Sequence, residues 1–237
     1  MNFFSRKIKL VLSAVLLFTL PIFVYSKDYS YYNEAPLTFA QSFRKNFFLT
    51  GGLCTVISIG QKSYTPVLFS VGGGYSFKIK NNFYLDTRIS FYSNYYLWDE
   101  SLQAALPSEV ENRTSTSINI ALDLPFVASF NFGKHTLRAG GGLGLIPKIN
   151  FLSSGVSTND EGSSGSAGED LNLINKYLWS YARWIYPQIA LSYSALLTNG
   201  WRAGLDFKYY LPLTSLIKGR GLNDSVIQLC LRLALSE

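Results

Sequence analysis

The sequence contains few of the residues from which metal sites and many catalytic sites are built. Its 237 residues include one histidine, one methionine and two cysteines, and only 15% are charged. A zinc site made of His and Cys is excluded by count, because a structural site needs about four such ligands. We therefore expect no metal and no cofactor. Hydrophobic residues make up 48% of the chain, which is far too much for a disordered protein.

Long apolar runs are absent after residue 26, so no segment is expected to cross a membrane as a helix. Residues 1–26 are typical of a secretory signal peptide. Arg6, Lys7 and Lys9 form its charged start, the apolar run is Leu10–Val24, and Val24-Tyr25-Ser26 fits a cleavage site. The run contains Pro21 and is shorter than the roughly 20 residues that an anchor helix needs. A polar lead-in (27–45) follows.

A strong excess of positive charge is absent as well. The formal charge of +6 includes three basic residues of the leader, and without them 18 basic residues face 15 acidic ones. This balance gives no reason to expect nucleic acid as a partner.

The rest of the chain alternates between apolar and small or polar residues. Near the C-terminus one face of a segment carries Trp201, Ala203, Leu205, Phe207, Tyr209 and Leu211, and the other carries Arg202, Gly204, Asp206, Lys208 and Tyr210. A period of two predicts a strand between two different environments. Eight such segments are found, beginning near residues 47, 69, 83, 118, 137, 189, 201 and 227.

The connections between these segments also alternate in length. Tight turns are expected at 80–82, 133–135 and 198–200, and longer loops at about 60–65, 94–114, 153–182 and 214–224. Outer-membrane barrels have short periplasmic turns and long extracellular loops. The sequence therefore predicts an all-β fold over residues 46–237: an eight-stranded antiparallel up-and-down transmembrane β-barrel in the bacterial outer membrane. Within the third long loop, the Gly/Ser/acidic tract 157–170 is expected to be mobile.

A soluble barrel with its apolar face inside is the alternative. Almost every strand offers four to six large apolar residues on one face, and eight such rows would overfill the narrow interior of an eight-stranded barrel. The opposite face, with Gly, Ser, Ala and a few charges, fits that interior. Aromatic residues near the strand ends, such as Trp98, Trp184 and Trp201, are typical of membrane interfaces.

One stretch also resembles a known group, the small outer-membrane barrels of the OmpA, OmpX and OmpW type. It comprises Ile120-Ala121-Leu122-Asp123-Leu124-Pro125-Phe126, Phe130-Asn131-Phe132 and Arg138-Ala139-Gly140-Gly141-Gly142. The resemblance implies two partners, outer-membrane lipid and the barrel-insertion machinery. It also implies either a structural or surface-interaction role or, as for OmpW-type barrels, a narrow channel for small or hydrophobic solutes.

Alternation directs seven charged residues into the lumen: Asp86, Arg88, Asp123, Arg138, Asp206, Lys208 and Arg232. Unpaired charges in a poorly hydrated space are costly, so we expect these residues to pair and to plug the lumen, although a wet pore remains the alternative. Cys54 and Cys230, on the first and last strands, form a possible pair. They could meet as a disulfide or remain buried thiols.

No catalytic residues are expected, since the single histidine, His135, falls in a tight turn, and we do not expect an enzyme. Loops 94–114 and 153–182 hold eight of the 15 acidic residues and could bind an extracellular ligand, or the acidity could serve solubility alone.

Overall fold

The computed structural model describes residues 46–57, 65–197, 200–218 and 222–235. The expected signal peptide and polar lead-in lie outside these residues. Within them, no helix has both the length and the apolar character needed to cross a membrane.

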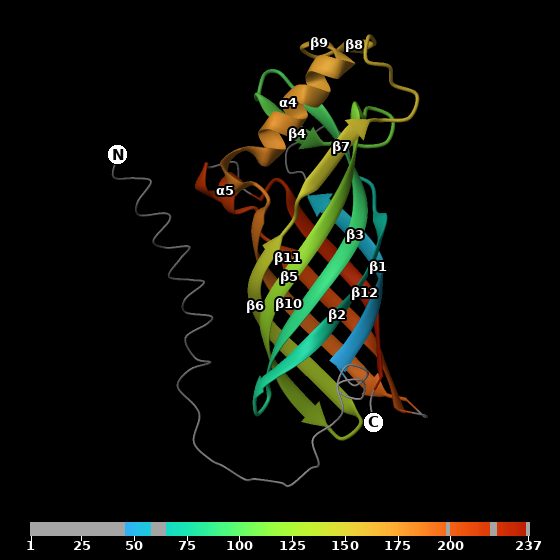
Figure 1. Cartoon of the computed structure of the whole chain (residues 1–237), viewed down its shortest axis with the longest axis vertical. Coiled ribbons are helices and arrows are strands. Elements are labelled where there is room, and N and C mark those ends of the chain that lie inside the picture. The colour runs from blue at the N-terminus through green and yellow to red at the C-terminus, as the bar shows by residue number, and fades with distance from the viewer. Residues whose placement is uncertain (1–45, 58–64, 198–199, 219–221, 236–237) are drawn as a thin grey trace, which may run out of the picture.

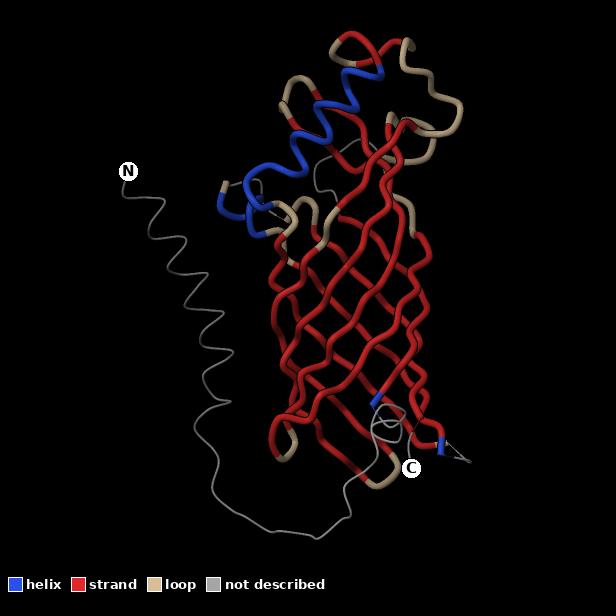
Figure 2. Tube along the Cα trace, in the orientation of Figure 1, coloured by secondary structure: helices blue, strands red, loops and turns tan. Residues whose placement is uncertain are grey.

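Eight long antiparallel strands form a closed barrel (Figures 1 and 2). Each strand pairs with the next one along the chain, and the last pairs with the first, so the barrel has no free edge. This confirms the expected fold class. The strands are β1 (Phe47–Ile57), β2 (Leu68–Lys80), β3 (Phe83–Asp99), β5 (Ser115–Phe132), β6 (His135–Leu145), β10 (Ile185–Leu196), β11 (Trp201–Tyr210) and β12 (Ser225–Leu235).

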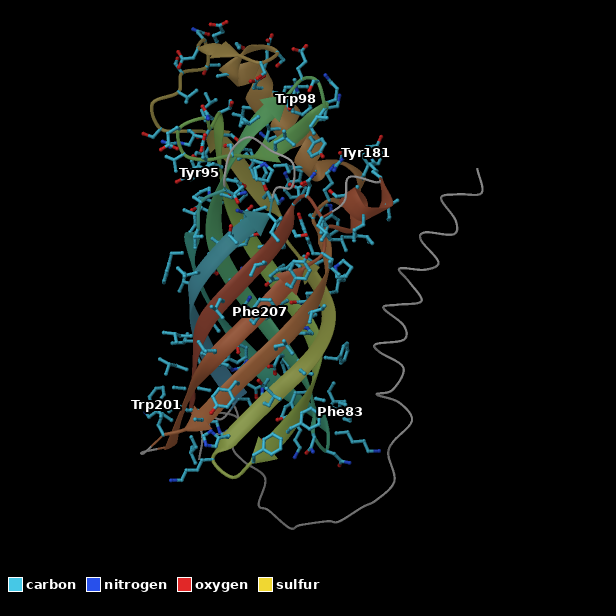
Figure 3. All side chains as sticks on the ribbon, turned by 180° about the vertical axis from the view of Figure 1, so that it is seen from behind. Phe83, Tyr95, Trp98, Tyr181, Trp201 and Phe207 are labelled. Atoms are coloured by element: carbon cyan, nitrogen blue, oxygen red, sulfur yellow. The ribbon has the colours of Figure 1, made fainter. Side chains whose placement is uncertain are left out.

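The barrel wall is apolar outside and polar inside. On β12, Leu229, Leu231 and Leu233 are 48%, 65% and 47% exposed, whereas Gln228 and Arg232 are buried. The other strands follow the same pattern, and their apolar side chains project outward around the whole wall (Figure 3). A protein that folded in water would bury these side chains, so the outer surface is built for an apolar solvent.

The two ends of the barrel differ. At one end, which we call the turn end, residues 81–82 and 133–134 make tight turns, with Asn81 and Gly133 at positive φ. At the other, the loop end, β3 and β5 extend beyond the barrel and pair with two short strands, β4 (Ala104–Pro107) and β7 (Lys148–Leu152). The connections there also hold β8 (Glu161–Gly162), β9 (Gly165–Ser166), α4 (Ala167–Trp179), the 3-10 helix η1 (Ser180–Ala182) and α5 (Leu213–Ile217).

Helix α4 packs on this extension of the sheet, and together they form a folded cap (Figure 1). The cap core contains Tyr96, Trp98, Ala104, Ala105, Ile174, Tyr177 and Leu178. The tract 157–170, which was expected to be mobile, contains β8, β9 and the start of α4. Ser166 and Glu169 form a capping box that starts α4, and the buried Asp170 carboxylate accepts hydrogen bonds from the amides of Ser163 and Ser164.

Pro125 lies in the middle of β5, where a proline is expected only at a bulge because it has no N–H for the ladder. The structure accommodates it differently. Leu85 pairs with Phe126 and Arg88 with Asp123, so the register is the same on both sides, but the β3–β5 ladder omits the intervening positions. The barrel thus accepts the proline through a local gap in pairing, without an extra residue.

Candidate functional site: the charged lumen

All seven charged residues that alternation directs inward lie in the lumen, where they form two clusters. The Asp86 cluster lies nearer the turn end and consists of Ser76, Asp86, Arg138, Asp206 and Arg232. Arg138 donates to both carboxylate oxygens of Asp86 at 3.2 Å. Arg232 Nη1 lies 3.2 Å from Asp86 Oδ2 and 3.3 Å from Asp206 Oδ2. The Ser76 hydroxyl accepts from both arginines, at 3.0 and 3.1 Å. Residues from β2, β3, β6, β11 and β12 are thereby joined across the barrel.

An aromatic ring supports this cluster from the side. The guanidinium of Arg232 lies 3.5 Å from the centroid of the Phe48 ring. That ring in turn occupies the space above Gly74, where a Cβ would lie only 2.4 Å from a ring carbon. Glycine at position 74 is thus required by the close approach of two groups, the backbone oxygen of Thr87, which is the nearer, and the Phe48 ring that packs against Arg232.

The Asp123 cluster lies nearer the loop end and consists of Arg88, Asp123, Lys208, Tyr210 and Gln228. Asp123 Oδ2 accepts from Arg88 Nε at 2.8 Å, from Lys208 Nζ at 2.6 Å and from the Tyr210 hydroxyl at 3.0 Å. Arg88 also donates to Tyr210 at 2.9 Å and to the side-chain oxygen of Gln228. The side chains of Arg88 and Asp123 are both 0% exposed. The other two strands of this cluster, β11 and β12, contribute Lys208, Tyr210 and Gln228 but no carboxylate, so Asp123 alone balances its two cations.

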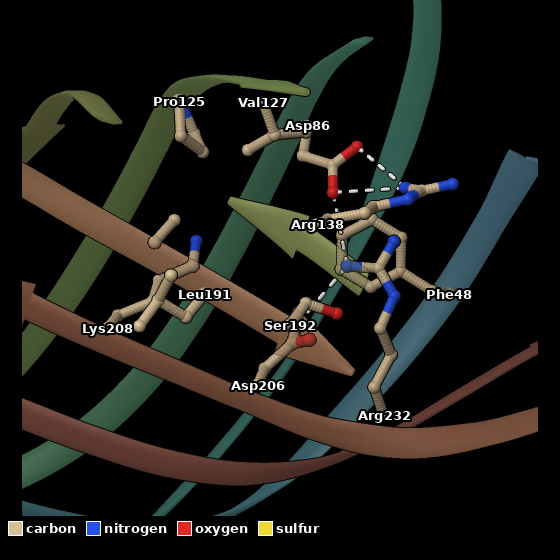
Figure 4. Close-up of a pocket in the computed structure, with 11 residues that line it drawn as sticks. Phe48, Asp86, Pro125, Val127, Arg138, Leu191, Ser192, Asp206, Lys208 and Arg232 are labelled. Atoms are coloured by element: carbon tan, nitrogen blue, oxygen red, sulfur yellow. Dashed lines mark hydrogen bonds and ion pairs between the residues drawn. The ribbon is translucent and has the colours of Figure 1, made fainter. Parts of the chain in front are cut away.

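A small cavity adjoins the Asp86 cluster and Lys208 of the Asp123 cluster. The cavity lined by Asp86, Arg138, Asp206, Lys208 and Arg232 has a volume of about 10 Å³ (Figure 4). A cavity needs about this volume to hold a single water molecule. The lumen at this depth is filled by protein side chains.

An apolar layer lies beyond the Asp123 cluster, toward the loop end. It contains Cys54, Val56, Tyr92, Ala121, Ile146, Tyr186, Tyr210 and Val226. Above it, the buried amine of Lys148 donates to the Tyr96 hydroxyl at 2.8 Å and lies 5.7 Å from the centroid of the Tyr186 ring. Lys148 therefore links the lumen to the cap, because Tyr96 belongs to the cap core.

The two cysteines both face the lumen but are not bonded. Cys54 pairs in register with Gln228, and Cys230 pairs with Gly52, so the two thiols are two positions apart across the β1–β12 seam. Both are free and buried.

Sequence reasoning identified the charges but not their neutral partners. Ser76, Phe48, Tyr210 and Gln228 also complete the clusters, and the same alternation places each of them inward. His135 lies at the turn end, where its Nδ1 is 2.7 Å from the Tyr193 hydroxyl. In the described part of the chain, no group of His, Cys, Asp and Glu could hold a metal ion.

No protein-family model matches the sequence, and no curated protein matches it. Among solved structures the chain is similar to Ail, the attachment invasion locus protein of Yersinia pestis, at 10% identity over 81% of this chain and 98% of that one, with a TM-score of 0.37. It is also similar to the outer membrane enzyme PagL, at 12% identity over 80% and 99%, with a TM-score of 0.36.

A third similar structure is that of the outer membrane protein AlkL, at 10% identity over 90% of this chain and 94% of that one, with a TM-score of 0.33. The chain is thus similar to small outer-membrane barrels, and its own strand pairing establishes the closed eight-stranded barrel.

Proposed function

We propose that this chain is an integral outer-membrane protein whose lumen is sealed and whose cap faces the cell exterior, with a structural or surface-interaction role rather than an enzymatic one. The outer wall supports membrane integration. Large apolar residues with 40–65% exposure surround the barrel on every strand. A soluble protein rarely shows contiguous apolar patches above a few hundred Å².

The main observation in support of a sealed lumen is the pair of ionic clusters. They cross the barrel at two depths, adjoin a cavity of only about 10 Å³, and lie beneath an apolar layer. A conducting pore needs a continuous column of water, whereas the charged groups of these side chains are bonded to one another across the barrel. Four buried polar atoms of the clusters, Arg88 Nη1, Asp123 Oδ1, Asp206 Oδ1 and Gln228 Nε2, have no hydrogen-bond partner. A narrow channel for small or hydrophobic solutes is the competing function, and it would need an apolar, open lumen instead.

The orientation follows the usual plan of such barrels, with short turns in the periplasm and elaborate loops outside. The turn end would then face the periplasm, and the cap, with most of the acidic residues, would face the exterior as the surface for any ligand. Outer-membrane lipid and the barrel-insertion machinery are the other partners that this proposal requires.

Planar-bilayer recording on the refolded protein tests the sealed lumen. We expect no stable single-channel steps from the parent protein. Arg232→Ser removes a side chain that crosses the lumen and should allow brief openings. Because Arg232→Ser leaves three basic and three acidic residues in the clusters, any such current should discriminate little between anions and cations. Lys176→Ser, an exposed change on α4, should stay silent. A steady, selective current from the parent would establish the channel instead.

A further inference from the structure

Two short elements form a shelf beside the barrel at the loop end, which we define as η1, α5, Trp179 and Lys218. Helix α5 starts two residues beyond β11, and η1 ends two residues before β10, which is the neighbour of β11. The Thr214 hydroxyl of α5 donates to the carbonyl of Tyr181 in η1 at 2.8 Å. Figure 1 shows α5 projecting sideways past the wall, and Figure 3 shows Tyr181 on that side.

The burial pattern of α5 is inverted relative to a helix on a soluble protein. Its buried residues are the polar Thr214 and Ser215, whereas Leu216 and Ile217 are only half-buried. A short helix in water buries its leucines and exposes its hydroxyls. The barrel wall below shows the same inversion, so the apolar outer surface of β10 and β11 continues onto the shelf.

The exposed side chains of the shelf combine apolar, aromatic and cationic character. Tyr181 is 73% exposed and Trp179 is 51% exposed. The amine of Lys218 lies 3.4 Å from the centroid of the Tyr181 ring. Aromatic residues with a polar group, together with lysine, are the side chains that occupy the interface between hydrocarbon and headgroups.

The backbone holds Tyr181 in this outward position. Tyr181 has φ 54° and ψ 34°, and Ala182 also has a φ of 54°. Two successive non-glycine residues in the left-handed region are uncommon and cost free energy, so the surrounding contacts must maintain them.

We propose that this shelf lies in the headgroup layer of the leaflet at the loop end, where Tyr181 and Lys218 bind the phosphate groups of anionic lipid. The inference rests on the proposed membrane barrel.

Fluorescence quenching in vesicles locates the shelf. Parent protein and Trp179→Phe are inserted into phosphatidylcholine vesicles, and the difference between their emission is assigned to Trp179. A nitroxide on the lipid headgroup should quench this difference more strongly than a nitroxide at the end of the acyl chain. Stronger quenching by the chain-end label, or quenching by aqueous iodide alone, would overturn the proposal.

Lipid selectivity tests the chemistry of the bound group. We expect parent protein to prefer phosphatidylglycerol over phosphatidylcholine at the shelf, measured by the relative quenching of Trp179 by the two labelled lipids. Lys218→Glu should lower this preference by more than about fivefold, because fivefold is the effect of one lysine near an anionic surface and the new carboxylate adds repulsion. Lys176→Glu makes the same charge change on the exposed face of α4 and should leave the preference unaltered.

An unaltered preference in Lys218→Glu, or an equal loss in Lys176→Glu, contradicts phosphate binding by the shelf. Insertion is measured separately, from the heat-dependent gel mobility of the folded barrel. A parent protein that never inserts would overturn the membrane barrel itself, whereas insertion with a water-exposed Trp179 would overturn only the shelf.

Discussion

At the scale of single residues, Asp123 is the central anion of its lumen cluster. It is the one carboxylate within hydrogen-bonding distance of both Arg88 and Lys208, and it also accepts from Tyr210. Arg88 is its direct cross-strand partner on β3, whereas Lys208 reaches it from β11 across the lumen. Two buried cations therefore depend on a single anion, and they would repel each other without it.

Asp123→Asn should destabilise the barrel strongly. The change keeps the size of the side chain but leaves Arg88 and Lys208 buried without a counter-charge, and breaking a buried ion pair in this way costs about 3–5 kcal/mol. Equilibrium unfolding by urea in lipid vesicles measures the free energy. Glu111→Gln, an exposed carboxylate of the cap, should have almost no effect. A stability of Asp123→Asn equal to that of the parent would mean that water reaches this cluster.

The cysteines lead to a second prediction at this scale. Their offset of two positions across the β1–β12 seam favours free thiols, because a disulfide requires Cα atoms within about 7 Å and Cβ vectors that converge. Mass spectrometry of unreduced protein, denatured with an alkylating reagent present, should find both Cys54 and Cys230 modified. A mass two daltons below that of the dithiol form, with no alkylation, would show that the seam is cross-linked instead.

At the scale of elements, the cap shows a structure that local sequence patterns do not predict. The Ser166-x-x-Glu169 spacing is a recognised start signal for a helix, but Gly and Ser around it give the tract the composition of a flexible loop. Packing stabilises α4: Tyr177 contacts Trp98 in a T-shaped, edge-to-face arrangement with ring centroids 6.2 Å apart. Trp98 is about 80 positions earlier in the chain, so no local pattern could reveal this contact.

Ile174→Ala should loosen the cap without opening the barrel. Ile174 is fully buried in the cap core, and truncating a buried isoleucine costs about 2–5 kcal/mol. We expect faster cleavage within 153–182 by added protease in vesicles, with strand content by circular dichroism unchanged. Asn172→Ala, on the exposed face of α4, should be cleaved at the parent rate. Equal rates for Ile174→Ala and parent would show that α4 does not depend on this packing.

At the scale of the whole molecule, alternation predicts the face of a residue but not its position around the barrel. It therefore found the eight strands and the seven inward charges. It could not find that Arg232 joins Asp86 and Asp206, because that pairing depends on the tilt and register of strands far apart in sequence. The strand ends were missed for a related reason: β3 and β5 continue past the barrel because β4 and β7 pair with them there.

The orientation of the whole barrel can be tested on intact cells, because the two ends carry different protease sites. Among the described residues, every glutamate lies at the loop end: Glu100, Glu109, Glu111, Glu161 and Glu169. Exposed lysines at the turn end include Lys78, Lys80 and Lys134. A glutamate-specific protease should therefore cut the protein on whole cells after Glu100, Glu111 and Glu161, because these exposed sites lie outside both α4 and the cap core.

A lysine-specific protease should leave the turn-end sites intact until the outer membrane is permeabilised, after which fragments ending at Lys80 and Lys134 should appear. The masses of the fragments identify each site, so cleavage of Lys176 on the cap is not mistaken for cleavage at the turn end. Cutting at Lys80 or Lys134 on intact cells, with Glu161 protected, would place the turns outside and the cap in the periplasm. The shelf would then lie in the headgroup layer of the inner leaflet, and the acidic cap would face the periplasm, where it could bind no extracellular ligand.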